Sequence, residues 1–101
     1  MPSYYIIPKA QEDLKEIRRY TIEKWGAEQA DKYLTSLRDT LQVLLKMPGI
    51  GRSRADDLRD GIFSYPYASH MIYYRWSENR LIVIAVLHTR MVPAAHLEER
   101  F

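Results

Sequence analysis

The sequence predicts an α+β fold: a small antiparallel sheet with an N-terminal helical hairpin packed on one face. Two observations lead to it. Apolar residues recur at helical spacing between positions 10 and 45, and from Gly61 onward they alternate with a period of two. A short Tyr- and Ile-rich segment precedes the helices, so the expected order is β-α-α-β-β-β-α. At 101 residues the chain has room for one core, and residues 1–101 are expected to form a single domain.

The first strand is expected from Ser3 to Ile7, where Tyr and Ile favour extended backbone. Pro2 and Pro8 flank it, and a residue that cannot donate a backbone hydrogen bond is tolerated best at the edge of a sheet.

The first helix is expected to end at Gly26, and the second at the Met47-Pro48-Gly49 sequence. One face of the first helix carries Ala10, Leu14, Ile17, Thr21 and Trp25, spaced by three or four residues. A broader apolar stripe on the second comprises Ala30, Tyr33, Leu34, Leu37, Leu41, Leu44 and Leu45. Because the turn between the helices is very short, they must lie antiparallel.

A polar loop is expected from Ile50 to Asp60, followed by three strands. The first of these covers Gly61 to Tyr65 and is expected to break at Pro66. The second covers His70 to Trp76, and Ser77-Glu78-Asn79 forms a hairpin turn to the third, Arg80 to His88.

Strand 80–88 is apolar on both faces, which is typical of a strand in the middle of a sheet with both faces covered. The helical hairpin covers one face. Either the segment Pro93 to Glu99 or a partner protein must cover the other.

Composition and charge exclude several classes of protein. Cysteine is absent, which excludes disulfides and thiolate zinc sites. The net charge of +2 is shared evenly between the two halves, so no basic block of the kind that grips phosphates is present. No apolar run is long enough to span a membrane, and the N-terminus lacks the pattern of a signal peptide. We therefore expect a cytoplasmic protein.

Few residues suggest chemistry. No glycine-rich nucleotide motif is present, and no serine has a base at a recognisable spacing. His70 and His88 should share a face of two pairing strands, but no third ligand stands at a suitable spacing, so neither a metal nor a cofactor is expected. His70 is expected to be hydrogen-bonded within the sheet. Arginines are interleaved with the aspartates of the polar loop, Asp56, Asp57 and Asp60, and these groups are expected to form solvated ion pairs.

Eight tyrosines are unusual in a chain of this length. Tyrosine packs its ring while its hydroxyl stays hydrated, so it concentrates at protein interfaces. Stacking on RNA bases and packing at the margin of the core are the alternatives. The low net charge favours a protein interface.

Six blocks of residues, taken together, resemble the RelE/ParE superfamily of toxins from bacterial type II toxin–antitoxin systems, and the ParE branch more closely. The blocks are Ala10, Asp13, Leu14 and Ile17; Trp25-Gly26 with Gln29-Ala30 and Tyr33; Pro48, Gly51 and Arg52; Ser69 to Tyr74; Leu87-His88-Thr89-Arg90-Met91; and His96-Leu97. They cover nearly the whole chain in order. Val92 departs from the family, which often has Asp at that position.

The RelE branch cleaves messenger RNA on the ribosome, with lysines and an arginine on the sheet, an arginine after the last strand and a tyrosine near the C-terminus. Here Arg90 matches the arginine after the last strand, no lysine follows Lys46, and His96 stands near the tyrosine position. Phosphodiester cleavage needs positive charge to stabilise its transition state. The resemblance therefore implies a protein that is not an enzyme; a RelE-type endoribonuclease using His88, Arg90 and His96 is the alternative.

The resemblance to ParE implies a toxin that binds the DNA gyrase–DNA complex and blocks replication, with no cofactor, metal or small-molecule substrate. Its expected target-binding residues are His88, Arg90, Met91 and His96. It also implies a hetero-oligomer with a ParD-like antitoxin, which should order a disordered segment on the toxin. We expect that antitoxin to contact Trp25, Tyr33 and Tyr73.

Overall fold

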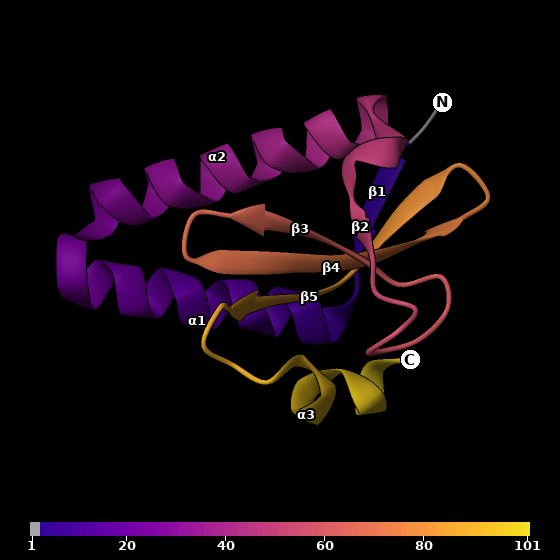
Figure 1. Cartoon of the computed structure of the whole chain (residues 1–101). Helices are drawn as coiled ribbons and strands as arrows, with labels where there is room; N and C mark the ends of the chain where they lie inside the picture. The colour runs from indigo at the N-terminus through magenta and orange to yellow at the C-terminus, as the bar shows by residue number, and fades with distance from the viewer. Residues whose placement is uncertain (1–2) are drawn as a thin grey trace.

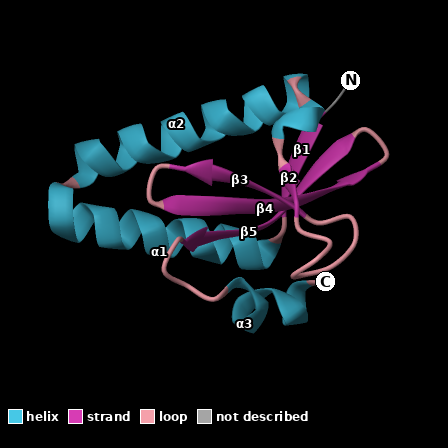
Figure 2. Cartoon of the chain, in the orientation of Figure 1, coloured by secondary structure: helices cyan, strands magenta, loops and turns pink. Residues whose placement is uncertain are grey.

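A five-stranded sheet forms the middle layer of the fold in the computed structural model, which describes residues 3–101 (Figure 1). Two long antiparallel helices cover one face of the sheet, called here the near face, and a short C-terminal helix lies against the opposite, far face (Figure 2). The elements in chain order are β1 (Ser3–Ile6), α1 (Pro8–Trp25), α2 (Ala27–Lys46), β2 (Arg52–Ser53), β3 (Phe63–Tyr67), β4 (His70–Ser77), β5 (Arg80–His88) and α3 (Pro93–Leu97). Single 3-10 turns at Pro48–Ile50 and Glu98–Arg100 follow α2 and α3. None of the helices is long and apolar enough to cross a membrane, within residues 3–101.

The predicted α+β class, the helical hairpin on one face and the order of the main elements are confirmed. Gly26 joins the two long helices with a φ of 93°, a value that suits glycine better than other residues. The strand order is β1-β5-β4-β3-β2, so β1 is an edge strand as expected.

Two expectations about the sheet need correction. The sheet is antiparallel except at β1, which runs parallel to β5. Strand direction follows from the path of the chain through three hairpin-linked strands, which local periodicity does not encode. In addition, β3 runs through Pro66 rather than breaking there, and the polar loop contributes the two-residue strand β2. Since β2 pairs with β3 only at Phe63 and Ser64, β3 has a free edge beyond them, where proline is tolerated.

Strand β5 is buried from Leu81 to Leu87 and is covered on both faces, as predicted. On the near face it packs with Leu37, Leu41 and Leu44 of α2. On the far face Leu97 of α3 is fully buried against it, together with residues of the loop before β3. The C-terminal segment and this loop therefore supply the second cover.

A β-bulge interrupts the pairing of β4 with β5. Tyr74 pairs with Val83 but Tyr73 pairs with Ala85, so Ile84 is an extra residue on β5. Ile84 and Ala85 both pack in the far-face cluster. Strict alternation along β5 is therefore wrong, although the expected sharing of one face by His70 and His88 is confirmed by their direct pairing.

Beyond Val83 no strand formed by residues 3–101 lies beside the outer edge of β5, because β1 pairs only with residues 80–83. Two side chains bond its backbone instead. The Asp13 carboxylate accepts a hydrogen bond from the Val86 amide at 3.1 Å, and the Arg100 guanidinium donates to the Ile84 carbonyl at 3.1 Å. Arg100 also donates twice to Asp13, at 2.6 and 3.1 Å. This largely buried ion pair therefore ties α1 and the C-terminus to the bulge.

Replacement of Arg100 by leucine is expected to lower the free energy of unfolding by about 2 kcal/mol, because it leaves a buried carboxylate and a buried carbonyl without their partner. Chemical denaturation measures the effect. Arg19→Leu is the matched control, since Arg19 pairs with Glu16 on the exposed face of α1 and should change stability little. Equal losses in the two variants would contradict this role of Arg100.

Candidate functional site

A groove of about 1020 Å³ lies at the end of the molecule where the two long helices join, between α1, the start of α2 and the ends of β4 and β5. Most of the surface that lines the groove is apolar, and polar side chains are interspersed along it. The lining residues are Glu16, Ile17, Tyr20, Thr21, Trp25, Gln29, Tyr33, Ser69, His70, His88, Arg90 and Met91.

Five of the seven predicted site residues meet in this groove. His88, Arg90 and Met91 reach it from the end of β5, whereas Trp25 and Tyr33 reach it from the two helices. The Trp25 side chain is 72% exposed and Met91 is 46% exposed, so together they offer apolar surface at the groove. The residues expected to bind the target and those expected to bind the antitoxin therefore share one surface.

The structure does not bring Tyr73 to the groove. Its side chain points to the far face and is 4% exposed, so it is not available to a partner there. The guanidinium of Arg54 lies 5.4 Å from the centre of the Tyr73 ring. Tyr73 next to Tyr74 on a strand must face away from the helices, and the covering loop explains why it is buried.

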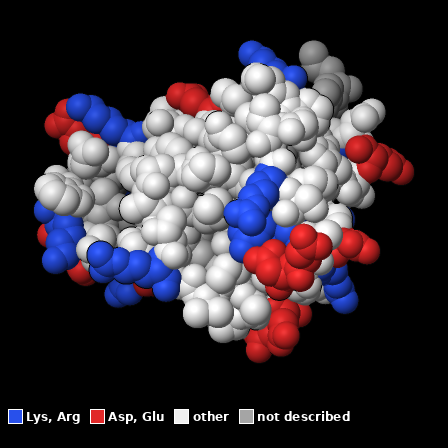
Figure 3. Space-filling model, viewed as in Figure 1, with Lys and Arg blue, Asp and Glu red and all other residues white. Residues whose placement is uncertain are grey.

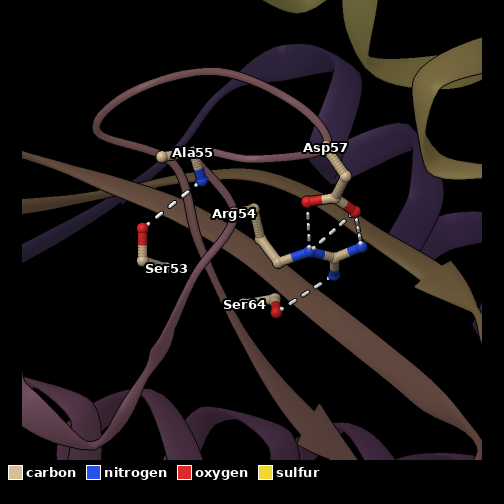
Figure 4. A network of polar contacts seen from close by, with 5 residues as sticks. All are labelled: Ser53, Arg54, Ala55, Asp57 and Ser64. Carbon is tan, nitrogen blue, oxygen red and sulfur yellow. Dashed lines mark hydrogen bonds and ion pairs between the residues drawn. The ribbon is translucent and has the colours of Figure 1, made fainter.

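Polar contacts hold Arg54 over that ring (Figure 4). Its guanidinium donates to both oxygens of Asp57 and, at 3.2 Å, to the hydroxyl of the buried Ser64. The pair lowers the pKa of the Asp57 carboxyl, chiefly through these hydrogen bonds. This pair confirms ion pairing within the polar loop, and its role is to fasten the loop to the sheet.

His96 also lies apart from the groove. It is exposed on α3, which sits against the far face, and it does not line the groove. The expected grouping of His96 with His88 and Arg90 is therefore not formed.

A hydrogen-bonded row of side chains builds the floor of the groove. The Tyr33 hydroxyl lies 2.6 Å from Nδ1 of His70, and the His70 ring lies 5.4 Å from the ring of His88, its partner across the strands. Nδ1 of His88 accepts a hydrogen bond from the Arg90 amide at 3.1 Å. The Tyr67 hydroxyl donates to the Tyr33 carbonyl at 2.7 Å, which fixes α2 to β3. These contacts order the floor without a ligand.

Burial shifts the pKa of two side chains in this row, His70 and Tyr33. It lowers the pKa of the His70 imidazole to about 4, and the neighbouring His88 adds to the effect. Burial also raises the pKa of the Tyr33 phenol. At neutral pH both groups are therefore uncharged.

The expectation that His70 is hydrogen-bonded within the sheet was partly wrong, because its partner, Tyr33, belongs to α2. His70 was also missing from the predicted site. The signal that could have found it was the shared face of His70 and His88. Tyr20 and Ser69 were missed as well, and nothing in their local sequence marks them.

The groove has the character of a binding surface. Within residues 3–101, no group of three His, Asp or Glu side chains converges as metal ligands would. On the face seen in Figure 3, Lys and Arg lie in separate groups around a broad uncharged area. Exposed aromatic residues beside a small number of polar groups are typical of protein interfaces.

Comparison with known proteins identifies the family. Residues 4–93 match the profile described as the ParE toxin of the type II toxin–antitoxin system, parDE. The chain belongs to the ParE toxin family. Toxin ParE1 of Caulobacter vibrioides is 35% identical over 97 residues, which cover 96% of this chain and 99% of the relative. Toxin ParE1 of Mycobacterium tuberculosis is 37% identical over 89 residues, covering 87% and 90%.

A solved structure supports the fold of this ParE-family chain. A chain from the structure titled "Chromosomal ParDE TA system from P. aeruginosa" superposes with a TM-score of 0.73 and 17% identity, covering 87% of this chain and 95% of that one. All groove-lining residues fall inside the stretch matched to the ParE profile, whereas Arg100 lies beyond it.

The partly buried His70 makes the stability of the ParE-family domain sensitive to pH. In the unfolded chain the pKa of His70 returns to about 6.5. Between this pH and about pH 4, the unfolded state therefore binds a proton at His70 that the folded state does not bind. This contribution to stability is complete above pH 6.5 and is lost as the pH falls toward 4. We expect the free energy of unfolding to be lower at pH 5 than at pH 7.5, and the difference to be smaller in His70→Gln.

His96→Gln is the control for this experiment, because His96 is exposed and should leave the pH dependence unchanged. Urea denaturation at the two pH values gives the comparison. An unchanged drop in stability in His70→Gln would show that another group is responsible.

Proposed function

We propose that this chain is a toxin that inhibits DNA gyrase and thereby DNA replication, and that a ParD-like antitoxin neutralises it as its partner in a hetero-oligomer. Membership of the ParE toxin family supports the proposal. The observation that carries it is the single groove in which His88, Arg90 and Met91 lie beside Trp25 and Tyr33.

The composition of this groove favours binding over RNA cleavage. Cleavage would require several cations around the scissile phosphate and a proton donor and acceptor close to it. Arg90 is the one positively charged side chain lining the groove within residues 3–101, and His70 is neutral at physiological pH. His96, which the endoribonuclease alternative would use, lies elsewhere.

The shared groove also suggests how neutralisation works. A peptide segment seated on Trp25 and Tyr33 would cover His88, Arg90 and Met91 at the same time. The antitoxin and gyrase would then compete for one surface, and no conformational change would be needed to switch the toxin off.

Purified chain, free of antitoxin, is expected to abolish supercoiling by gyrase and to trap cleaved DNA. Arg90→Ala should reduce this inhibition at least about tenfold, because it removes an exposed cation that can pair with the target. Arg75→Ala is the matched control, since Arg75 is exposed on the far face of β4 and away from the groove. A supercoiling assay over a range of toxin concentrations gives the comparison.

Two results would contradict the proposal. If gyrase is unaffected while translating ribosomes cut messenger RNA, the chain acts as the endoribonuclease alternative. If Arg75→Ala weakens inhibition as much as Arg90→Ala, the groove is not the surface that binds the target.

Antitoxin binding is expected to depend on the exposed indole at the groove. Trp25→Ala should weaken the complex with a co-expressed ParD-like antitoxin at least about tenfold, because exposed tryptophans that become buried carry a large share of binding energy. Phe101→Ala is the control: Phe101 is 40% exposed and stacks with Arg59, outside the groove. Isothermal titration calorimetry measures both affinities, and equal values for Trp25→Ala and the parent chain would place the antitoxin elsewhere.

A further inference from the structure

The hydrogen bonds in the groove floor determine which ring nitrogen of each histidine carries a proton. Nδ1 of His88 accepts the hydrogen bond from the Arg90 amide, so in the neutral ring the proton is on Nε2. Nε2 of His88 is therefore a donor. It has no hydrogen-bond partner among residues 3–101.

The position of the proton on the His70 ring follows from its hydrogen bond in the same way. Burial keeps the phenol of Tyr33 protonated and the imidazole neutral. Ser69 also lies beside the Tyr33 hydroxyl and, against the larger effect of burial, lowers the pKa of the phenol, as a group that donates a hydrogen bond to its oxygen does. The Tyr33 hydroxyl therefore directs its own proton to Nδ1 of His70, at 2.6 Å. The His70 proton is then also on Nε2, and this donor too is unpaired within the described chain.

Arg90 adds a third donor group beside these two. Its side chain is exposed, lines the groove and forms no ion pair within residues 3–101. The carboxylate of Glu16 also lines the groove, but it is paired with Arg19 at 2.6 Å. The polar end of the groove thus offers N–H donors that lack acceptors, next to the apolar surface of Trp25 and Met91.

We propose that the His70, His88 and Arg90 donors bind a carboxylate, supplied by an Asp or Glu side chain that apolar residues flank on a partner polypeptide. This deepens the proposed function, because it rests on the groove being the antitoxin-binding surface and names what the groove recognises. A carboxylate accepts several hydrogen bonds at once, and its charge strengthens each of them. A nucleic-acid phosphate fits less well, because one arginine in a mostly apolar groove does not follow a charged backbone.

Small probes test this preference on the free protein, without gyrase or antitoxin. The first probe is 3-phenylpropionate, which joins an apolar ring to a carboxylate, and the second is its neutral amide, 3-phenylpropanamide. NMR titration should show the carboxylate binding at least about fivefold more tightly, with shifts of the Trp25 indole and of both imidazoles. Equal binding of the two probes would overturn the proposal, as would tighter binding of phenyl phosphate than of 3-phenylpropionate.

Two substitutions at His88 test the role of its Nε2. His88→Gln places an amide N–H close to the position of Nε2 and should keep most of the preference for the carboxylate. His88→Asn retains an acceptor for the Arg90 amide but has no donor at that position, so the preference should fall to near that of the amide probe. Retention of the preference in His88→Asn would refute the assignment. Two-bond proton–nitrogen spectra check the tautomers directly, and a proton on Nδ1 of either ring would also overturn it.

These results stay separate from those of the proposed function. A chain that prefers the carboxylate probe but leaves gyrase unaffected supports the carboxylate site and contradicts the gyrase target. A chain that inhibits gyrase but shows no preference contradicts the carboxylate site alone.

Discussion

The edge of β5 beyond Val83 is the constraint on which the rest of the structure depends. Its backbone groups are buried beside a bulge and pair with no strand of residues 3–101, and unpaired polar groups in such a place are costly. Asp13 and Arg100 supply the missing hydrogen bonds and pair with each other. The same contacts join α1 to the sheet and hold the C-terminal turn in place, and α1 also supplies one side of the groove.

The groove depends on tertiary structure rather than on any one segment. The helical hairpin contributes the exposed aromatic side, and the ends of β4 and β5 contribute the polar side. The Tyr33–His70 hydrogen bond joins the two sides, and burial keeps this pair uncharged. A surface made in this way is ordered before any partner arrives, which reduces the entropy that binding must overcome.

Most of the fold could be predicted from the sequence, because hydrophobic periodicity, proline and glycine positions and the Glu78-Asn79 turn are local signals. The direction of β1 and the bulge at Ile84 could not, since both follow from how distant segments meet. If β4 and β5 paired regularly from Ser77 and Arg80 onward, His70 would lie opposite Leu87. The bulge places it opposite His88 instead. Five of the seven predicted site residues lie together in one groove, although the sequence did not predict that they would share it. Tyr73 failed because its own strand does not reveal that the Arg54 loop covers it.

The bulge decides which side chains at the end of β5 face the groove. Side chains alternate along a strand, so the face on which His88 lies depends on whether the number of residues between it and the turn is odd or even. At Ile84, which does not line the groove, the bulge interrupts this alternation and brings His88 opposite His70; regular pairing of the same residues would bring Leu87 there. Deletion of Ile84 would leave His88 opposite His70, because it removes the extra residue and the bulge together. A change that straightened the bulge but kept all nine residues of β5 would instead turn His88 to the far face and Leu87 to the groove, while every residue of the groove remained in the sequence. Sequence comparison confined to the residues that line the groove would not detect the change.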